Sequence, residues 1–115
     1  MKKDYTVFLK HILESIEAIE KYTENLTDES FLASQEKQDS IIRRLEIIGE
    51  AVKNLPDGFR EKHPHVEWNK AMATRNILIH HYFGIDLKTV WDTVTESLPI
   101  FKKQIENLLK QEKSS

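Results

Sequence analysis

The sequence predicts a single all-α domain, folded as an up-and-down bundle of four to five helices. Only three glycines and three prolines occur among the 115 residues, so few positions would interrupt a helix. Apolar side chains recur at spacings of three and four residues along most of the chain, which is the periodicity of an amphipathic helix. The stretches between these helices are short, and short connections place consecutive helices side by side in opposite directions.

Composition narrows the class of protein. Hydrophobic residues make up 39% and charged residues 31% of the chain, as in an ordinary globular protein, and the length suits one domain over residues 1–115. The chain has no cysteine, which excludes disulfides and thiolate sites. No apolar run reaches the roughly 18 residues of a membrane span, and no signal-peptide core follows the first residues. We therefore expect a cytoplasmic protein without membrane association.

The first helix is expected from Asp4, which can cap it, to about Asn25. Thr27 is expected to cap a short helical piece that ends near Ala33. The buried stripe of the first helix has the spacing of one helix face and consists of Phe8, Leu9, Ile12, Leu13, Ile16 and Ile19.

The second long helix is expected from Ser34 to about Leu55. Gly49 lies in its middle, where glycine costs roughly 1 kcal/mol relative to alanine, so we expect another helix to pass closely there. Arg43 and Arg44 are expected to form surface ion pairs. Their predicted partners are the glutamates of the same helix, Glu46 and Glu50.

Residues 56–66 connect this helix to the next. Pro56, Asp57 and Gly58 end the second helix, and one further helical turn is expected before Pro64. His63 and His65 resemble a metal-binding pair, but no carboxylate or cysteine partners stand at ligand spacing. We interpret them as polar loop histidines and expect no metal site.

The third helix is expected from Glu67 or Trp68 to His80 or slightly beyond, with Gly84 ending it. Asp86 is expected to cap the fourth helix, and Pro99 to kink or restart it. Residues 110–115 are expected to fray. The apolar stripe expected for this last segment consists of Leu87, Val90, Trp91, Val94, Leu98, Ile100, Phe101, Ile105, Leu108 and Leu109.

Polar residues that can bind anions or transfer protons gather in residues 75–82, Arg-Asn-Ile-Leu-Ile-His-His-Tyr. At 100° per residue, Arg75 and Tyr82 share a helix face, whereas His80 lies about 140° from Arg75. A straight helix therefore cannot aim Arg75, His80 and Tyr82 at one point. Either the helix deforms near His80, or a second copy of the chain supplies part of the site.

These residue types suit phosphate chemistry. Arginine binds phosphate through two parallel hydrogen bonds and stays charged at any working pH, and histidine has an ordinary pKa near neutrality. Residues 63–85 also carry four histidines together with Lys70 and Arg75, against Glu67 alone, in a chain of net charge −2. A structural alternative remains, in which Arg75 neutralises a carboxylate, His80 fills a satisfied place in the core, and Tyr82 packs.

Arg75, His80 and Tyr82 form the pattern R-x4-H-x-Y, which resembles the signature of the HEPN superfamily in its HepT-like branch of toxin–antitoxin proteins. The resemblance extends over nearly the whole chain. Blocks in the same order and spacing are residues 45–51, 64–68, 75–76, 80–84 and 90–91. His81 stands where many relatives have glycine.

This resemblance implies a HEPN-like homodimer that acts as an endoribonuclease toxin without metal or cofactor. His80 would be the general base or acid, and Arg75 would bind the phosphate of the RNA. Asn76 would orient His80 or contact the phosphate, and His81 would support the same chemistry. The implied partner is a minimal nucleotidyltransferase antitoxin, which would silence the toxin by transferring AMP to Tyr82 (AMPylation).

Two alternatives stay open at this point. In the first, the chain is a non-catalytic helical binding partner of a nucleotidyltransferase. In the second, it is a structural dimer whose interface contains Arg75, His80 and Tyr82. Toxicity that is lost in His80→Ala with the fold intact would select the ribonuclease.

Overall fold

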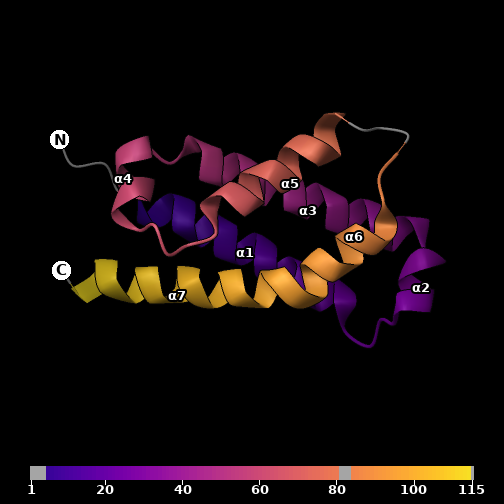
Figure 1. Ribbon diagram of the computed structural model, residues 1–115. Coiled ribbons are helices and arrows are strands. Elements are labelled where there is room, and N and C mark those ends of the chain that lie inside the picture. The colour runs from indigo at the N-terminus through magenta and orange to yellow at the C-terminus, as the bar shows by residue number, and fades with distance from the viewer. Residues whose placement is uncertain (1–4, 81–83, 115) are drawn as a thin grey trace.

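The computed structural model describes residues 5–80 and 84–114, with side chains to residue 111. The described residues form helices joined by short loops and contain no strand, so the predicted all-α class is confirmed (Figure 1). Their helices are α1 (Thr6–Thr23), α2 (Asp28–Leu32), α3 (Gln35–Asn54), α4 (Asp57–Lys62), α5 (Trp68–His80), α6 (Leu87–Asp92), the π-helical segment η1 (Thr93–Ser97) and α7 (Leu98–Ser114). Because α6, η1 and α7 follow one another without a gap, four long helical rods and two short helices form the bundle.

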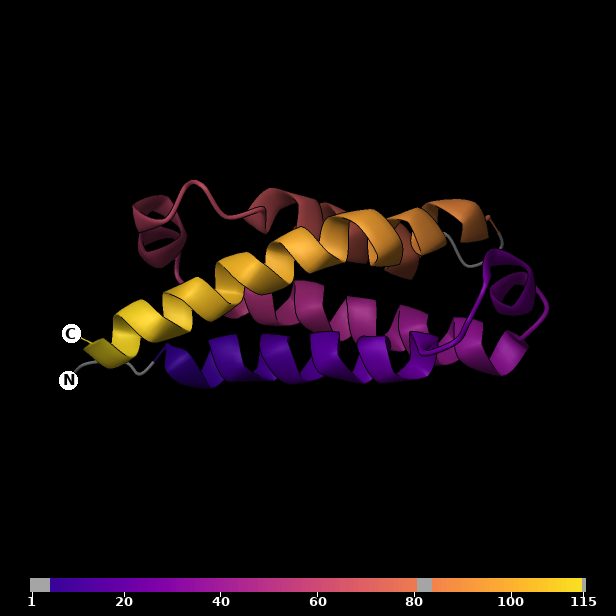
Figure 2. The ribbon, with the colours of Figure 1, turned by 90° about the horizontal axis from the view of Figure 1, so that it is seen from below.

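The long rods run up and down. Helix α3 packs against both α1 and α5, and α1 packs against α7 as well. The start of α1 lies near the end of α7 and near α4, whereas α2 lies at the opposite end of the bundle (Figures 1 and 2). The packing order is therefore α5, α3, α1, α7, and α5 occupies an edge position with α3 as its main neighbour.

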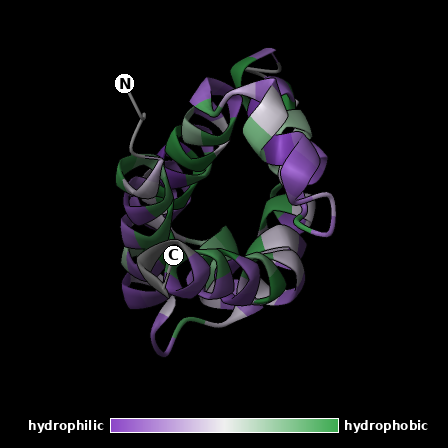
Figure 3. Cartoon of the chain, turned by 90° about the vertical axis from the view of Figure 1, so that its left-hand side faces the viewer, coloured by the Kyte–Doolittle hydropathy of each residue, from purple (hydrophilic) through white to green (hydrophobic). Residues whose placement is uncertain are grey.

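The core lies between these rods, and Figure 3 shows the more hydrophobic parts of the ribbon turned toward the inside of the bundle. Most of the predicted stripe residues are buried, because the faces that carry them are the faces that meet. The buried side chains include Leu9, Ile12, Ile16, Ile19, Ile41, Leu45, Ile48, Val52, Val90, Leu98, Phe101, Ile105 and Leu108.

Predicted N-caps set three of the helix starts. The hydroxyl oxygens of Thr27 and Ser34 accept backbone N–H bonds at the starts of α2 and α3, and the Asp86 carboxylate does so at the start of α6. Helix α1 begins at Thr6, and Asp4 lies outside the described residues. These caps are local side-chain chemistry, which is why the sequence predicted them.

The last rod restarts at Pro99, as predicted, and differs from its prediction after residue 109. Pro99 does not break the rod, because the wide turn of η1 lets the Leu98 N–H bond the Thr93 carbonyl just before it. Pro99 then occupies the first turn of α7, where a missing N–H costs little. The expected fraying from residue 110 is wrong, since α7 continues to Ser114. Lysine, glutamine and glutamate after Leu109 are good helix formers.

Candidate active site

Helix α5 carries the motif as far as His80, while His81 and Tyr82 lie outside the described residues. The α-helix is continuous from Trp68 to His80, so the deformation considered as one alternative does not occur before His80. Within the described part of the chain, no hydrogen bond or ion pair joins Arg75 to His80. The backbone of one copy therefore keeps the two residues on different sides of the helix.

The predicted close passage of a helix at Gly49 is confirmed, and the helix that passes is α5. A Cβ atom built on Gly49 would lie 2.3 Å from the Cβ of Arg75 and 2.8 Å from the carbonyl oxygen of Ala71. Carbon atoms in contact normally lie about 3.5–4.0 Å apart. Only glycine therefore allows α3 and α5 to approach at this level.

The Arg75 side chain is largely covered, with 17% of its surface exposed. Its Nη1 donates to Oδ1 of Asn76 at 3.3 Å, its Nη2 lies 3.8 Å from Oε2 of Glu50, and its Nε is buried without an acceptor. Glu50 itself is 63% exposed, and such exposed pairs contribute about 0–1 kcal/mol. Nε is enclosed, but Nη1 and Nη2 make only these two long contacts among the described residues, so they keep hydrogen-bonding capacity that an oxyanion can use.

Asn76 turns the Arg75 head toward the side of the helix where His80 lies. By helix periodicity, Asn76 stands about 100° from Arg75 and about 40° from His80. Because Asn76 accepts a hydrogen bond from Arg75, the long arginine side chain narrows the gap that the backbone leaves. No hydrogen bond from Asn76 to His80 is formed among the described residues.

His80 is exposed at the end of α5 and makes no hydrogen bond to a described residue. A satisfied core histidine is therefore the wrong interpretation of this residue. The structure does give Arg75 a carboxylate partner, Glu50, so that part of the structural alternative stands. Sequence reasoning paired Glu50 with Arg43 or Arg44 instead, because the sequence shows neighbours within one helix and not those across a helix crossing.

The two loop histidines lie apart from the motif. His63 packs its ring against Phe59, with 4.9 Å between ring centres, and its carbonyl oxygen accepts a bond from the Trp68 indole at 3.0 Å. The ring of His65 lies 6.2 Å from that of His63. In residues 5–80 and 84–114, no group of three or more His, Asp or Glu side chains could hold a metal ion.

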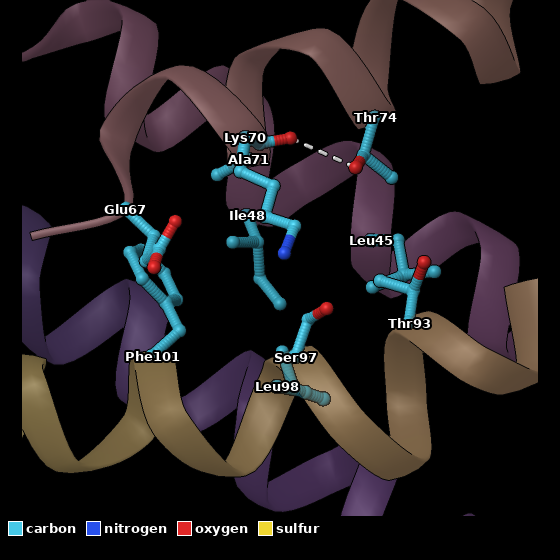
Figure 4. Close-up of a pocket in the computed structure, with 10 residues that line it drawn as sticks. All are labelled: Leu45, Ile48, Glu67, Lys70, Ala71, Thr74, Thr93, Ser97, Leu98 and Phe101. Atoms are coloured by element: carbon cyan, nitrogen blue, oxygen red, sulfur yellow. Dashed lines mark hydrogen bonds between the residues drawn. The ribbon is translucent and has the colours of Figure 1, made fainter.

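Three hollows border α5; one lies at its start beside Trp68, Asn69 and Lys70, and the other two extend to Thr74. Figure 4 shows the first of these two, of about 40 Å³, between α3, α5 and the η1–α7 segment, with Thr74 donating to the Lys70 carbonyl at its edge. This volume is far below the roughly 300 Å³ of a small-molecule site, so it cannot admit a nucleotide. The second hollow, of about 370 Å³, lies between α5 and α6 beside Ile77, which is 54% exposed.

No described helix is both long and apolar enough to cross a membrane.

Comparison with known proteins identifies a family for this chain. A family model described as Ribonuclease HepT-like matches residues 12–108. A Thermococcus cleftensis protein named "Probable ribonuclease HepT" is 43% identical over 110 residues, which is 96% of this chain and 100% of that protein. A Methanocaldococcus jannaschii protein named "Gamma-glutamylcyclotransferase and putative RNase" is 48% identical over 111 residues.

The matched region covers 96% of this chain but only 50% of that second relative. No solved structure gives a significant match. The family match covers most of the chain, including α3, α5 and the described part of the R-x4-H-x-Y motif. The chain therefore belongs to the Ribonuclease HepT-like family.

Proposed function

We propose that the chain is a metal-independent endoribonuclease and the toxin of a toxin–antitoxin pair. The observation that carries this proposal is the state of Arg75, a covered guanidinium with unused N–H groups on the helix that presents an exposed His80. Family membership and the ribonuclease names of the relatives support RNA as the substrate.

The reaction uses the RNA's own 2′-hydroxyl. A base takes the 2′-hydroxyl proton, the 2′-oxygen forms a bond to the phosphorus, and the bond from phosphorus to the 5′-oxygen breaks as an acid protonates that oxygen. His80 acts as the base or the acid, with a contribution of roughly 10²–10⁴-fold. Arg75 binds the phosphate and stabilises the added negative charge of the transition state. The need for a 2′-hydroxyl selects RNA over DNA.

The active form is a homodimer in which the α5 helices of two copies face each other. The outward arc of α5 includes Ala73, Ile77 and His80, and all three side chains are exposed. Because α5 has one main neighbour, this arc is free to pack against a second copy. Such packing brings the His80 side chains of the two copies to one interface.

The partner is a minimal nucleotidyltransferase antitoxin that transfers AMP to Tyr82. Tyr82 shares a helix face with Arg75 when α5 is extended by two residues, so the new phosphodiester places negative charge near the arginine. The adenylate also occupies space that RNA needs.

The test is incubation of purified protein with RNA, with and without EDTA. We expect cleavage to be unchanged by EDTA and the products to end in a 2′,3′-cyclic phosphate or its hydrolysis product. Activity that is lost in EDTA and restored by Mg²⁺ would overturn the histidine mechanism. Products with only 5′-phosphate ends, found by mass spectrometry, would exclude attack by the 2′-hydroxyl.

A further inference from the structure

The crossing of α3 and α5 concerns the residue that binds the phosphate. Gly49 of α3 lies against Arg75, and an added Cβ would be 2.3 Å from the Arg75 Cβ and 3.2 Å from its Cγ. It would also be 2.8 Å from the Ala71 carbonyl oxygen, one turn earlier in α5. Two of these three atoms, a Cβ and a backbone oxygen, cannot rotate away, so any side chain at residue 49 must displace α5.

The displacement would move the part of the α5 backbone that carries Arg75. Of the contacts that hold its guanidinium, the ion pair with Glu50 is long, at 3.8 Å, and exposed to solvent, and the bond to Asn76 is also long, at 3.3 Å. Neither contact is strong enough to restore the position of the head after a backbone shift. The place of the guanidinium is therefore set mainly by the place of its Cβ, which Gly49 determines.

We propose that Gly49 is a positioning residue for RNA cleavage: its missing side chain sets the location of Arg75 relative to the scissile phosphate. This inference rests on the proposed ribonuclease function. It also gives the mid-helix glycine a reason beyond packing, because glycine at this position weakens α3 as a helix. Misplacement of a catalytic group by about 1 Å can cost about 100-fold in rate.

The matched pair of variants is Gly49→Ala and Gly58→Ala. Both glycines lie in helices, but a Cβ at Gly58 meets nothing within 4 Å. We expect Gly49→Ala to lower kcat by about 10- to 100-fold while circular dichroism shows a folded protein. Gly58→Ala should stay within about twofold of the unchanged protein. Equal activity of the two variants would contradict the proposal.

A double-mutant cycle separates positioning from general destabilisation. We expect Gly49→Ala to have little further effect in an Arg75→Ala background, since the group that it misplaces is already gone. Multiplied losses would mean that Gly49 acts independently of Arg75 and would overturn the proposal. Full activity of Arg75→Ala would overturn the proposed function of Arg75. Full activity of Gly49→Ala, with Arg75→Ala inactive, would overturn only the positioning role of Gly49.

A second variant covers the case in which Gly49→Ala does not fold. The pair Gly49→Ala/Arg75→Gly removes the Cβ that the new methyl group strikes. Recovery of Tm in the pair, compared with Gly49→Ala alone, supports a direct steric contact between residues 49 and 75. Because Arg75→Gly weakens α5 by itself and leaves the Ala71 carbonyl in place, the single variant Arg75→Gly is the reference. A loss of Tm from Gly49→Ala that is equally large in the Arg75→Gly background would contradict a direct contact between residues 49 and 75.

Discussion

Arg75 and His80 are treated differently by the fold, although they stand on the same helix. The guanidinium is largely covered beside Glu50, whereas the imidazole is exposed at the helix end. A covered cation suits charge stabilisation, because its electrostatic attraction for an anion is stronger where water is excluded. An exposed imidazole suits proton exchange.

The first prediction concerns His80. His80→Ala should lower RNA cleavage by about 10²- to 10⁴-fold, because the general base or acid is removed while an exposed side chain leaves the core intact. The measurement is the cleavage rate of a defined RNA, with circular dichroism to check the fold. His65→Ala is the control, as His65 is also an exposed histidine. Loss in the control alone, or in neither, would remove His80 from the mechanism.

The second prediction concerns Glu50. Its carboxylate lies beside the cation that RNA must reach, so Glu50→Gln should tighten RNA binding by about two- to fivefold. The probe is an RNA with a 2′-deoxy scissile position, measured by fluorescence anisotropy at low salt. Glu36→Gln, at the other end of α3, removes the same charge and should change binding less. Weaker binding in Glu50→Gln would mean that Glu50 supports the bound state.

The third prediction concerns Tyr82. Tyr82→Phe removes the acceptor oxygen and keeps the ring, so most cleavage should remain while resistance to the antitoxin appears. Both proteins are incubated with the nucleotidyltransferase and ATP, and then intact mass and residual cleavage are measured. An equal mass gain in both would place the modification elsewhere. Loss of cleavage in the unmodified variant would instead make the phenol part of the chemistry.

Single residues were predictable where their role follows from local chemistry. The glycine in the middle of a long amphipathic helix predicted a close crossing, and Gly49 meets Arg75 there. The Arg75–Glu50 pair was not predictable, because it depends on how α3 and α5 are placed. The bond from Arg75 to Asn76 was not predictable either, because helical angles do not describe how a long side chain bends.

At the scale of elements, the N-cap of α6 is sensitive to acid. The Thr89 hydroxyl donates to the Asp86 carboxylate at 2.8 Å and holds the pKa of Asp86 below its ordinary value of 3.8. A lowered folded-state pKa stabilises the protein above pH 3.8, and this contribution is lost as the pH falls through the lowered value.

The fourth prediction follows from this sign. Asp86→Asn can still cap the helix but does not titrate, so it should have a lower Tm than the unchanged protein at pH 7. The difference in Tm should shrink as the pH falls below 3.8. Thermal unfolding of both proteins across this range is the measurement. A difference that stays constant with pH would exclude the Asp86 carboxylate as its source.

Helices were predictable from caps and stripes, and the exceptions have a common cause. The starts of α2, α3 and α6 follow side chains that bind their own backbone, so a sequence reveals them. The π turn of η1 carries no such mark, because threonine, valine, glutamate and serine fit an α-helix equally well.

At the scale of the whole molecule, the sequence predicted the class and the up-and-down order from periodicity and loop length. It did not predict that α5 lies at the edge of the packing order, which follows from contacts between distant segments. This edge position leaves Ile77 exposed next to the motif.

The fifth prediction tests this surface. Ile77→Lys should convert the proposed dimer to a folded monomer with little activity, because a charge replaces an apolar contact. Light scattering at micromolar concentration measures the mass. Ile100→Lys is the matched control, since Ile100 on α7 is 56% exposed and Ile77 is 54% exposed. A dimer that survives Ile77→Lys, or a monomer that cleaves normally, would exclude this interface.

The edge position of α5 also bears on gene dosage. When a cleft needs two copies, mass action makes the number of complete clefts rise with the square of chain concentration below the dissociation constant. A tenfold increase in expression then gives an increase of about a hundredfold in cleavage capacity. At low expression the cell's RNA would stay intact. A burst of synthesis would raise the cleavage capacity steeply and arrest growth.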